Sequence, residues 1–179
     1  LADAVRQGAS HCIIATDTGS HVTHCKTAMK FGLEVLVEKP AATNAPGVHQ
    51  LQDAAAKYGR SLYVGCVMRF SESLNTFIDM LPRAGRLHLV RVECQSYMPD
   101  WRPHRSYLES YAAWPLEGGV LLDLIHEIDY SGWIFGWPEA VAARVRNMGR
   151  LGIAADEATE VSWEIDDSLQ VSVYLDYLS

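Results

Sequence analysis

Residues 12–40 read CIIATDTGSHVTHCKTAMKFGLEVLVEKP, and this stretch decides the fold. It begins with a short apolar run, Cys12–Thr16, and nearly ends with another, Val35–Val37; such runs are typical of strands that are covered on both faces. Between them, apolar residues recur at helical spacing over positions 22–29, and Gly32 marks the end of that helix. The stretch therefore predicts a strand, a helix and a second buried strand.

The same pattern then repeats once. Thr43 or Asn44 can cap the next helix and Gly59 can end it, after which Leu62–Val67 forms a third apolar run. Strands and helices that alternate with short connections predict right-handed crossovers and a parallel sheet. Residues 10–67 thus have the pattern of one half of a doubly wound, Rossmann-type α/β domain.

A complete dinucleotide-binding domain has two such halves, and the first normally carries a G-x-G-x-x-G loop. No stretch of this sequence matches that loop, and Leu1–Gln7 has the pattern of the end of a helix. The last predicted strand also stops abruptly over Asp176–Ser179. We therefore expect a chain that lacks the first half at its N-terminus and some residues at its C-terminus.

The pattern changes after residue 68, so we predict a partial Rossmann domain over 1–68 and an α+β domain over 69–179. A helix is expected near Leu74–Leu81, and a second is expected to run from Gly118-Gly119 to Phe135. A mainly antiparallel open sheet follows from alternating apolar residues, with Asp166-Asp167 as a hairpin turn. Its predicted strands are Leu87–Tyr97, Ala140–Arg146, Thr159–Ile165 and Leu169–Tyr174.

Composition and charge narrow the class of partner. Apolar residues make up 49% of the 179 residues, as in a globular protein, and the formal net charge of −7 argues against nucleic acid or an anionic membrane. No segment is apolar enough to span a bilayer or to act as a signal peptide, so we expect a cytoplasmic protein. The four cysteines form no C-x-x-C pair and are read as buried thiols, and no metal site is predicted.

Several motifs together resemble the glucose-fructose oxidoreductase and inositol dehydrogenase family, Gfo/Idh/MocA, over nearly the whole chain. The residues that carry the resemblance are Cys12–Thr16 with His21, Val35–Pro40, Arg69-Phe70, Gly118–Asp123, His126 and Asp129. The resemblance implies an NAD(P)-binding Rossmann domain followed by an α/β domain whose open sheet often mediates oligomerisation. It also implies an oxidoreductase that transfers a hydride to or from a sugar, a polyol or a sugar derivative.

Hydride transfer at a carbinol carbon requires a proton to move to or from the oxygen, and Lys39 and His126 are the candidate catalytic groups for this step. Lys39 follows a central parallel strand, at the edge where open α/β sheets bind ligands. In the family the matching lysine lies between nicotinamide and substrate, and its bond to proline is often cis. Without the downstream motifs, Glu38-Lys39-Pro40 would be read as an exposed strand end.

Asp123 lies three residues before His126, so the two share a face of the predicted helix, and Asp129 adds a third polar group. The family commonly places its aspartate and histidine four residues apart. This departure leaves His126 as the firmer catalytic candidate and the role of Asp123 open. The alternative for His126 is a buried histidine that ties the helix to the sheet.

NAD or NADP is the expected cofactor, and the sequence does not distinguish the two. The cofactor-binding candidates, all at predicted strand ends or the turns that follow them, are Thr16, Thr18, His21, Glu38, Lys39, Pro40 and Arg69. The alternative for the first turn is ordinary helix capping by Asp17 or Ser20. His21 and His24 are three apart on a helix, but no third metal ligand is evident.

The aromatic and polar loop over 98–117 is interpreted as a lid facing a carbohydrate, because sugars offer apolar faces and hydroxyl edges. Its substrate candidates, together with Asp129, are Arg105, Tyr107 and Tyr111, and Trp101 is considered with them. The alternative is plain packing beneath a long loop. A second hypothesis for the whole chain is a non-catalytic fragment or interaction module that forms a homodimer through the C-terminal sheet.

Overall fold

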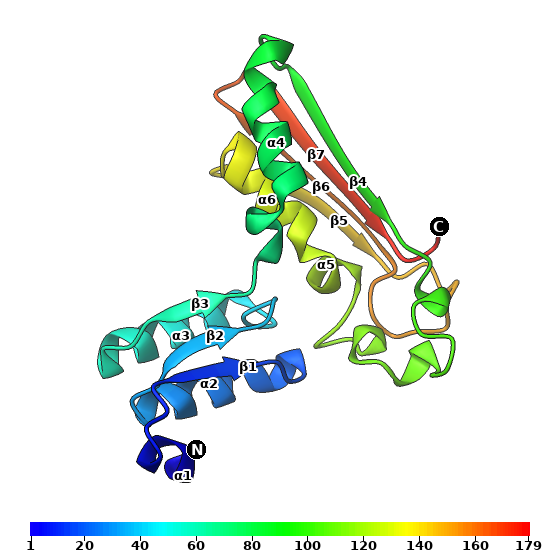
Figure 1. The fold of residues 1–179 in the computed structure, drawn as a ribbon. Helices are drawn as coiled ribbons and strands as arrows, with labels where there is room; N and C mark the ends of the chain where they lie inside the picture. The colour runs from blue at the N-terminus through cyan, green and yellow to red at the C-terminus, as the bar shows by residue number, and fades with distance from the viewer. The chain divides into compact units, whose positions relative to one another are not determined.

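The computed structural model describes residues 1–179, which form two compact units, Leu1–Gly65 and Cys66–Ser179 (Figure 1). The functional assignment of the two predicted ranges, 1–68 and 69–179, stays a prediction. None of the helices is both long and apolar enough to cross a membrane.

The first unit is built on a parallel sheet in the order β1-β2-β3, as the alternating pattern predicts. In chain order its elements are α1 (Ala2–Arg6), β1 (His11–Ile14), η1 (Thr18–Ser20), α2 (His21–Lys30), β2 (Glu34–Val37), α3 (Ala45–Tyr58) and β3 (Leu62–Val64). Gly32, with φ +84°, follows α2, and Gly59, with φ +59°, follows α3, because glycine adopts this left-handed conformation without a Cβ clash. Asn44 caps α3 by accepting a hydrogen bond from the main-chain N–H of Gly47 at 2.9 Å.

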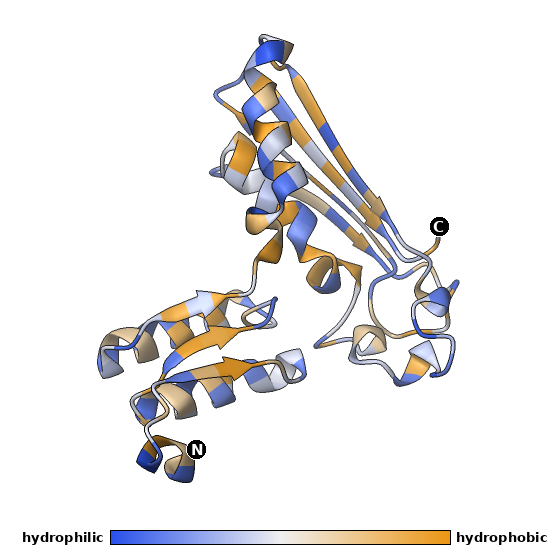
Figure 2. Cartoon of the chain, viewed as in Figure 1, coloured by the Kyte–Doolittle hydropathy of each residue, from blue (hydrophilic) through white to orange (hydrophobic).

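Helices α2 and α3 cover one face of this sheet and bury a small apolar core. Met29 and Leu51 from the helices meet Val35 and Val37 from β2, and all four are at most 1% exposed. Full burial of such a side chain stabilises the fold by about 1.5–3 kcal/mol. The apolar character of β1 and β2 is visible in Figure 2.

The other face of the sheet is open, so the expectation of strands covered on both faces is wrong for this chain. Ile13, Leu36 and Tyr63 are paired across the three strands and are 72%, 40% and 62% exposed. The reason lies in the order of the strands. Both crossovers are right-handed and advance in the same direction along the sheet, which puts α2 and α3 on the same side.

The second unit is a four-stranded sheet with helices against one face, and its strand order is β4-β7-β6-β5. Its helices and strands are η2 (Val67–Phe70), α4 (Glu72–Met80), η3 (Leu81–Ala84), β4 (Leu89–Gln95), η4 (Met98–Asp100), η5 (Tyr107–Glu109), η6 (Tyr111–Ala113), α5 (Val120–Asp123), α6 (Ile125–Phe135), β5 (Ala142–Arg146), β6 (Ala158–Ile165) and β7 (Leu169–Asp176). Two of the three strand pairings are antiparallel and the pairing of β4 with β7 is parallel, so the sheet is mixed and mainly antiparallel, as predicted.

The hairpin between β6 and β7 turns at Asp166 and Asp167, as the sequence predicts. Both residues have positive φ, +51° and +53°, and the N–H of Ser168 donates to the carbonyl oxygen of Ile165 at 3.1 Å. Two successive residues with positive φ are typical of a type I′ turn, and Ser168 is a third turn residue because Ile165 pairs with Leu169.

The prediction of four buried cysteines is wrong for three of them. Only Cys25 is buried, between α2 and the first sheet, whereas Cys12, Cys66 and Cys94 are partly exposed. Burial raises the pKa of the Cys25 thiol to about 11, with a smaller effect from Cys12. A thiol of this kind is largely protonated at neutral pH and behaves as a small apolar side chain.

Candidate active site

Two turns leave the first sheet at the same edge, because β1 and β2 are parallel and Ile14 pairs with Val37. Thr16 lies in the turn after β1 and is exposed, and Lys39 lies in the turn after β2 and is half-buried. The carboxyl ends of parallel strands are where open α/β sheets bind ligands. The structure therefore places the two predicted residues on neighbouring turns of one edge.

The buried side chain of His21 connects these two turns. Its side chain is 1% exposed, its Nδ1 lies 2.9 Å from the carbonyl oxygen of Pro40, and its Nε2 lies 2.9 Å from that of Thr16. Both ring nitrogens are thus engaged by main-chain groups of the chain itself. Thr18 is also buried, at 3% exposure, so neither predicted cofactor residue presents its side chain at the surface of this unit.

The turn after β2 contains a cis peptide bond between Lys39 and Pro40. The main-chain N–H of Lys39 donates to the carboxylate of Glu38 at 3.3 Å, and that carboxylate also lies against Gly65, where an added Cβ would be 3.3 Å from its nearest oxygen. Glu38 therefore supports the main chain of this turn.

The capping alternative for the first turn is wrong. Asp17 and Ser20 precede η1 and α2, and neither side chain makes a capping hydrogen bond. The hydroxyl of Thr16 lies instead 3.2 Å from Nδ1 of His24. Polar groups at this edge are therefore not consumed by helix capping.

In the second unit, Arg69 and Asp129 contact each other. The guanidinium donates from Nε to Oδ2 at 2.9 Å and from Nη2 to Oδ1 at 2.7 Å. It also lies over the ring of Trp133, 5.5 Å from its centroid, at a distance typical of a cation–π contact. The candidate for cofactor binding and a candidate for substrate binding thus form one ion pair that joins η2 to α6.

Asp123 is buried and accepts hydrogen bonds from two tyrosines. The hydroxyl of Tyr111 donates to Oδ1 at 2.7 Å and the hydroxyl of Tyr177 donates to Oδ2 at 3.2 Å. Burial, followed by the charge of Asp123, raises the pKa of Tyr177. These contacts tie η6 and the C-terminal segment to α5, which is a structural task for Asp123.

Asp123 and His126 do not share one continuous helix, and this expectation is wrong. The helix is interrupted at Leu124, whose ψ of +36° lies outside the helical range, so that α5 ends at Asp123 and α6 begins at Ile125. His126 lies in the first turn of α6 and is half-buried, and Asp129 follows one turn later. Because of this break, Asp123 and His126 are not related by the geometry of a regular helix.

Gly118 and Gly119 allow the chain to enter α5. A Cβ on Gly118 would meet the main chain of Tyr111 and Ala112, and a Cβ on Gly119, where φ is +92°, would meet the carboxylate of Asp156. That carboxylate accepts a hydrogen bond from the N–H of Leu121 at 2.9 Å and so stabilises the start of the helix. The sequence reasoning missed Asp156, whose only signal was an acidic pair, Asp156-Glu157, beside a predicted strand.

The substrate candidates of the 98–117 loop make contacts within the chain. Tyr107 donates to the carbonyl oxygen of Leu151 at 3.0 Å, and Arg105, which is exposed, donates to the carbonyl oxygen of Glu109 at 3.0 Å. Trp101 packs edge-on against Tyr177, with ring centroids 5.2 Å apart. The packing alternative is therefore realised for the aromatic residues, and a contact with substrate stays a prediction.

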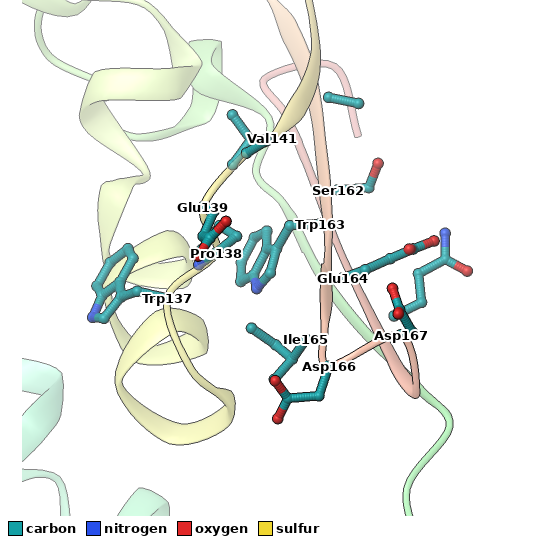
Figure 3. Close-up of a pocket in the computed structure, with 13 residues that line it drawn as sticks. Trp137, Pro138, Glu139, Val141, Ser162, Trp163, Glu164, Ile165, Asp166 and Asp167 are labelled. Atoms are coloured by element: carbon teal, nitrogen blue, oxygen red, sulfur yellow. The ribbon is translucent and has the colours of Figure 1, made fainter.

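A cavity of about 780 Å³ lies elsewhere in the second unit and contains none of the predicted site residues. It is bounded by the segment that follows α6 and by the end of the β6–β7 hairpin, with Trp137, Glu139, Trp163 and Asp166 among the side chains around it (Figure 3). Neither His126 nor Arg69 lines this cavity, so it gives no reason to move the candidate site there. No group of three or more His, Cys, Asp or Glu side chains is arranged to hold a metal ion.

The strand-end edge of the first unit offers several polar groups to a ligand. Thr16 and Lys39 offer a hydroxyl, an ammonium group and exposed main chain, and no side chain caps α2.

Two family models match the chain. The model of the oxidoreductase family with an NAD-binding Rossmann fold matches residues 3–66, and that of the GFO/IDH/MocA C-terminal domain matches residues 83–179. The chain is 30% identical to the rhizopine catabolism protein MocA of Rhizobium meliloti over 126 residues, 69% of this chain and 37% of that protein. It is 28% identical to the scyllo-inositol 2-dehydrogenase (NADP(+)) IolW of Bacillus subtilis (strain 168) over 136 residues, 74% of this chain and 37% of that protein.

Solved structures of dehydrogenases are also similar to this chain. The WlbA dehydrogenase of Chromobacterium violaceum, in complex with NADH and UDP-GlcNAcA, is 26% identical with a TM-score of 0.83, covering all of this chain and 52% of that one. The WlbA dehydrogenase of Bordetella pertussis, in complex with the same two ligands, is 24% identical with a TM-score of 0.84 and the same coverage, and shows the fold alone. The chain thus spans about half the length of these structures and 37% of the curated relatives.

Proposed function

Because the chain belongs to the Gfo/Idh/MocA family of oxidoreductases, we propose that it forms the proton-handling part of an NAD(P)-dependent oxidoreductase. The observation that carries the proposal is the placement of Lys39 on a strand-end turn, beside the turn of Thr16, at the ligand-binding edge of a parallel sheet. The match of residues 3–66 to an NAD-binding Rossmann model supports the same edge as the cofactor side.

Lys39 and His126 are the groups proposed to handle the proton. A bound nicotinamide supplies or accepts the hydride, and the substrate oxygen must then gain or lose a proton. The ammonium group of Lys39 can donate that proton and also stabilise negative charge on the oxygen. The imidazole of His126 can donate or accept a proton in the same step.

The proposed substrate is a sugar, a polyol or a sugar derivative. Support comes from two relatives, a dehydrogenase of scyllo-inositol and the WlbA structure with UDP-GlcNAcA. Both ligands carry secondary hydroxyl groups on a ring, which is the chemistry that a hydride-transferring site oxidises or forms. The exposed guanidinium of Arg105 remains a candidate for contact with a charged substituent of such a ring.

A second candidate function is a module that pairs with another copy of the chain through the outer face of the second sheet. This face carries opposite charges in neighbouring rows, with Glu93 and Glu160 on either side of Tyr174, and Arg144 beside Glu160. A face with both signs of charge can pair with itself about a twofold axis. A homo-oligomeric enzyme can pair through the same face. The two candidate functions therefore differ in whether the chain binds a cofactor.

The test is calorimetric titration of the purified chain with NADH and NADPH, with circular dichroism to confirm folding. Saturable binding that is weakened at least tenfold by Lys39→Met, but not by Lys26→Met, supports the proposal. Lys26 is a suitable control because it is exposed on α2 and contacts the side chain of Gln50. A folded chain that binds neither cofactor contradicts the proposal for this chain, and a dimer in sedimentation analysis would then favour the second candidate.

A further inference from the structure

We propose that His21 is a positioning residue that fixes the two strand-end turns to each other, with hydrogen on both of its ring nitrogens. This inference rests on the proposed function, because it gives a purpose to holding Lys39 and Thr16 at one edge. Its structural part is independent of any cofactor. His21 itself does not need to touch a ligand.

The hydrogen-bond geometry demands two donors on the ring. Each nitrogen lies 2.9 Å from a carbonyl oxygen, that of Pro40 on one side and that of Thr16 on the other. Carbonyl oxygens only accept hydrogen bonds, and a neutral imidazole carries one N–H. A neutral ring would leave one nitrogen lone pair facing an oxygen lone pair, inside a site that is 1% exposed and where an unmade hydrogen bond is costly.

The two acceptors belong to the segments that matter for the candidate site. Pro40 directly follows Lys39, and Thr16 is the predicted cofactor contact of the neighbouring turn. The two segments are also linked by the ladder bond from the N–H of Glu38 to the carbonyl oxygen of Ile14, at 2.8 Å, which lies at the strand ends. His21 therefore extends the connection between β1 and β2 by one further step, into the turns.

Few charged or titratable groups surround His21. The turns contribute the exposed carboxylates of Asp17 and Glu38 and the half-buried ammonium of Lys39, and its own helix contributes the exposed His24 and the buried thiol of Cys25. The first turn of α2 disfavours a positive charge, and so does burial. The two charge-assisted hydrogen bonds to the carbonyl oxygens, each stronger than a neutral one, oppose these effects.

The first test is nitrogen NMR of the chain labelled with ¹⁵N in its histidine rings, with the His21 signals assigned by loss in His21→Gln. We expect both ring nitrogens of His21 to give signals of the protonated type at neutral pH. One protonated and one pyridine-like nitrogen would overturn the proposal. The measurement is made on the wild-type chain without a cofactor, and the variant is used only to assign the signals.

The second test is hydrogen exchange of the two turns in His21→Gln, with His24→Gln as the matched control. Of the two polar atoms of a glutamine amide only the nitrogen donates, so one of the two carbonyl oxygens would face the amide oxygen. Exchange of the N–H groups of Glu38 and Ser20 should therefore accelerate about fivefold, the effect of one lost hydrogen bond. His24 contacts the hydroxyl of Thr16 and neither carbonyl oxygen that His21 contacts, so its replacement should leave both amides unchanged. Uniform acceleration over β3 and α3 as well would mean general destabilisation and would overturn the positioning role.

Cofactor titration separates this proposal from the proposed function. If the wild-type chain binds NADH, the affinity of the His21→Gln variant for NADH should be lower. The affinity of the His24→Gln variant should change less. If the wild-type chain does not bind, the proposed function fails, while the NMR and exchange results still decide the role of His21. Equal exchange in the two variants overturns the proposal whatever the chain binds.

Discussion

The guanidinium of Arg69 and the carboxylate of Asp129 form a two-bonded ion pair, with N–O distances of 2.9 Å and 2.7 Å, although 60 positions separate them in the sequence. Arg69 lies in η2 at the start of the second unit, and Asp129 lies in α6, one turn after His126. The hydrogen bonds with Asp129 are the main cause that raises the pKa of Arg69. The pair thus anchors the beginning of the unit to the helix that carries the catalytic candidate.

Removal of the pair should destabilise the second unit by more than its exposure suggests. The side chains are 37% and 14% exposed, so solvent screens the pair only in part. A double-mutant cycle with Arg69→Gln and Asp129→Asn should give a coupling energy of about 1–2 kcal/mol, measured by urea unfolding. Arg69→Lys should recover less than half of it, because lysine lacks the two-pronged geometry.

The control for this cycle is the pair of Arg91 and Glu93 on β4. Its N–O distance is 3.9 Å and its side chains are 66% and 51% exposed, so water screens it and its geometry is poor. The same cycle there should give no measurable coupling. Equal coupling at both pairs would contradict a specific anchoring role for Arg69.

The parallel half-sheet could be predicted from the sequence because each boundary has a local physical cause. Asn44 caps α3 and Gly59 ends it, while the apolar runs around Ile14 and Val37 form adjacent parallel strands. The open face with Ile13 could not be predicted, because covering depends on which side the crossovers take and not on the strand's own composition. Periodicity reports that a strand is apolar, but not how many layers lie over it.

The positions of the candidate residues in the fold could be predicted, but their contacts could not. Lys39 and Thr16 were expected at the strand-end edge, and they lie there. The pairing of Arg69 with Asp129 links segments far apart in the sequence, and no local spacing reports it. The break at Leu124 likewise depends on contacts around α5 and not on the Leu-rich sequence, which reads as one helix.

Glu157 is expected to be essential for the stability of the second unit. Its side chain is fully buried, and its carboxylate accepts hydrogen bonds from the N–H groups of Met148 at 2.7 Å, Arg150 at 2.9 Å and Leu151 at 2.6 Å. Glu157→Gln replaces one acceptor oxygen by an NH₂ group that faces these donors. We expect a loss of about 2–4 kcal/mol in the free energy of unfolding by urea. Glu160→Gln, at an exposed position of β6, is the control and should change stability little.

The hairpin turn at Asp166 and Asp167 can be improved. Both residues hold positive φ, which costs free energy in a residue with a Cβ and is typical of Asn-Gly in type I′ turns. Asp166→Asn combined with Asp167→Gly should therefore stabilise the chain by about 1 kcal/mol in urea unfolding. Asp167→Val should destabilise it, because a β-branched residue tolerates positive φ poorly. A double variant with lower stability than the wild type would contradict the assignment of the turn.

Replacement of Asp123 is expected to lower the stability of the fold. It accepts hydrogen bonds from Tyr111 and Tyr177, and Asp123→Asn would place an NH₂ group against one of these hydroxyls. The loss should be about 1–3 kcal/mol in urea unfolding, the cost of a buried, unmade hydrogen bond. Tyr111→Phe should cost less, because Asp123 keeps its bond to Tyr177. If Asp123→Asn unfolds like the wild type, the structural task assigned to Asp123 is wrong.

Tyr177 should make the chain unstable in alkali. Burial and the neighbouring charge of Asp123 raise its pKa in the folded state, whereas the unfolded chain releases the proton near the ordinary value of about 10. Above that value the unfolded state therefore holds fewer protons than the folded state, and the free energy of unfolding falls as pH rises. Below it, the contribution of the protonated hydroxyl is fully present.

Tyr177→Phe should make that alkaline decline shallower, although it lowers stability at neutral pH by removing the hydrogen bond to Asp123. Tyr130, whose pKa is raised to about 12, and Cys25 and Cys94, whose pKa values are raised to about 11, add declines of the same sign. These groups are present in wild type and variant alike, so the difference between the two slopes isolates Tyr177. Urea unfolding from about pH 8 to about pH 11 measures the slopes, with Tyr63→Phe, at a 62% exposed position, as the control. A slope for Tyr177→Phe equal to that of the wild type would show that the hydroxyl of Tyr177 is not held protonated by its site.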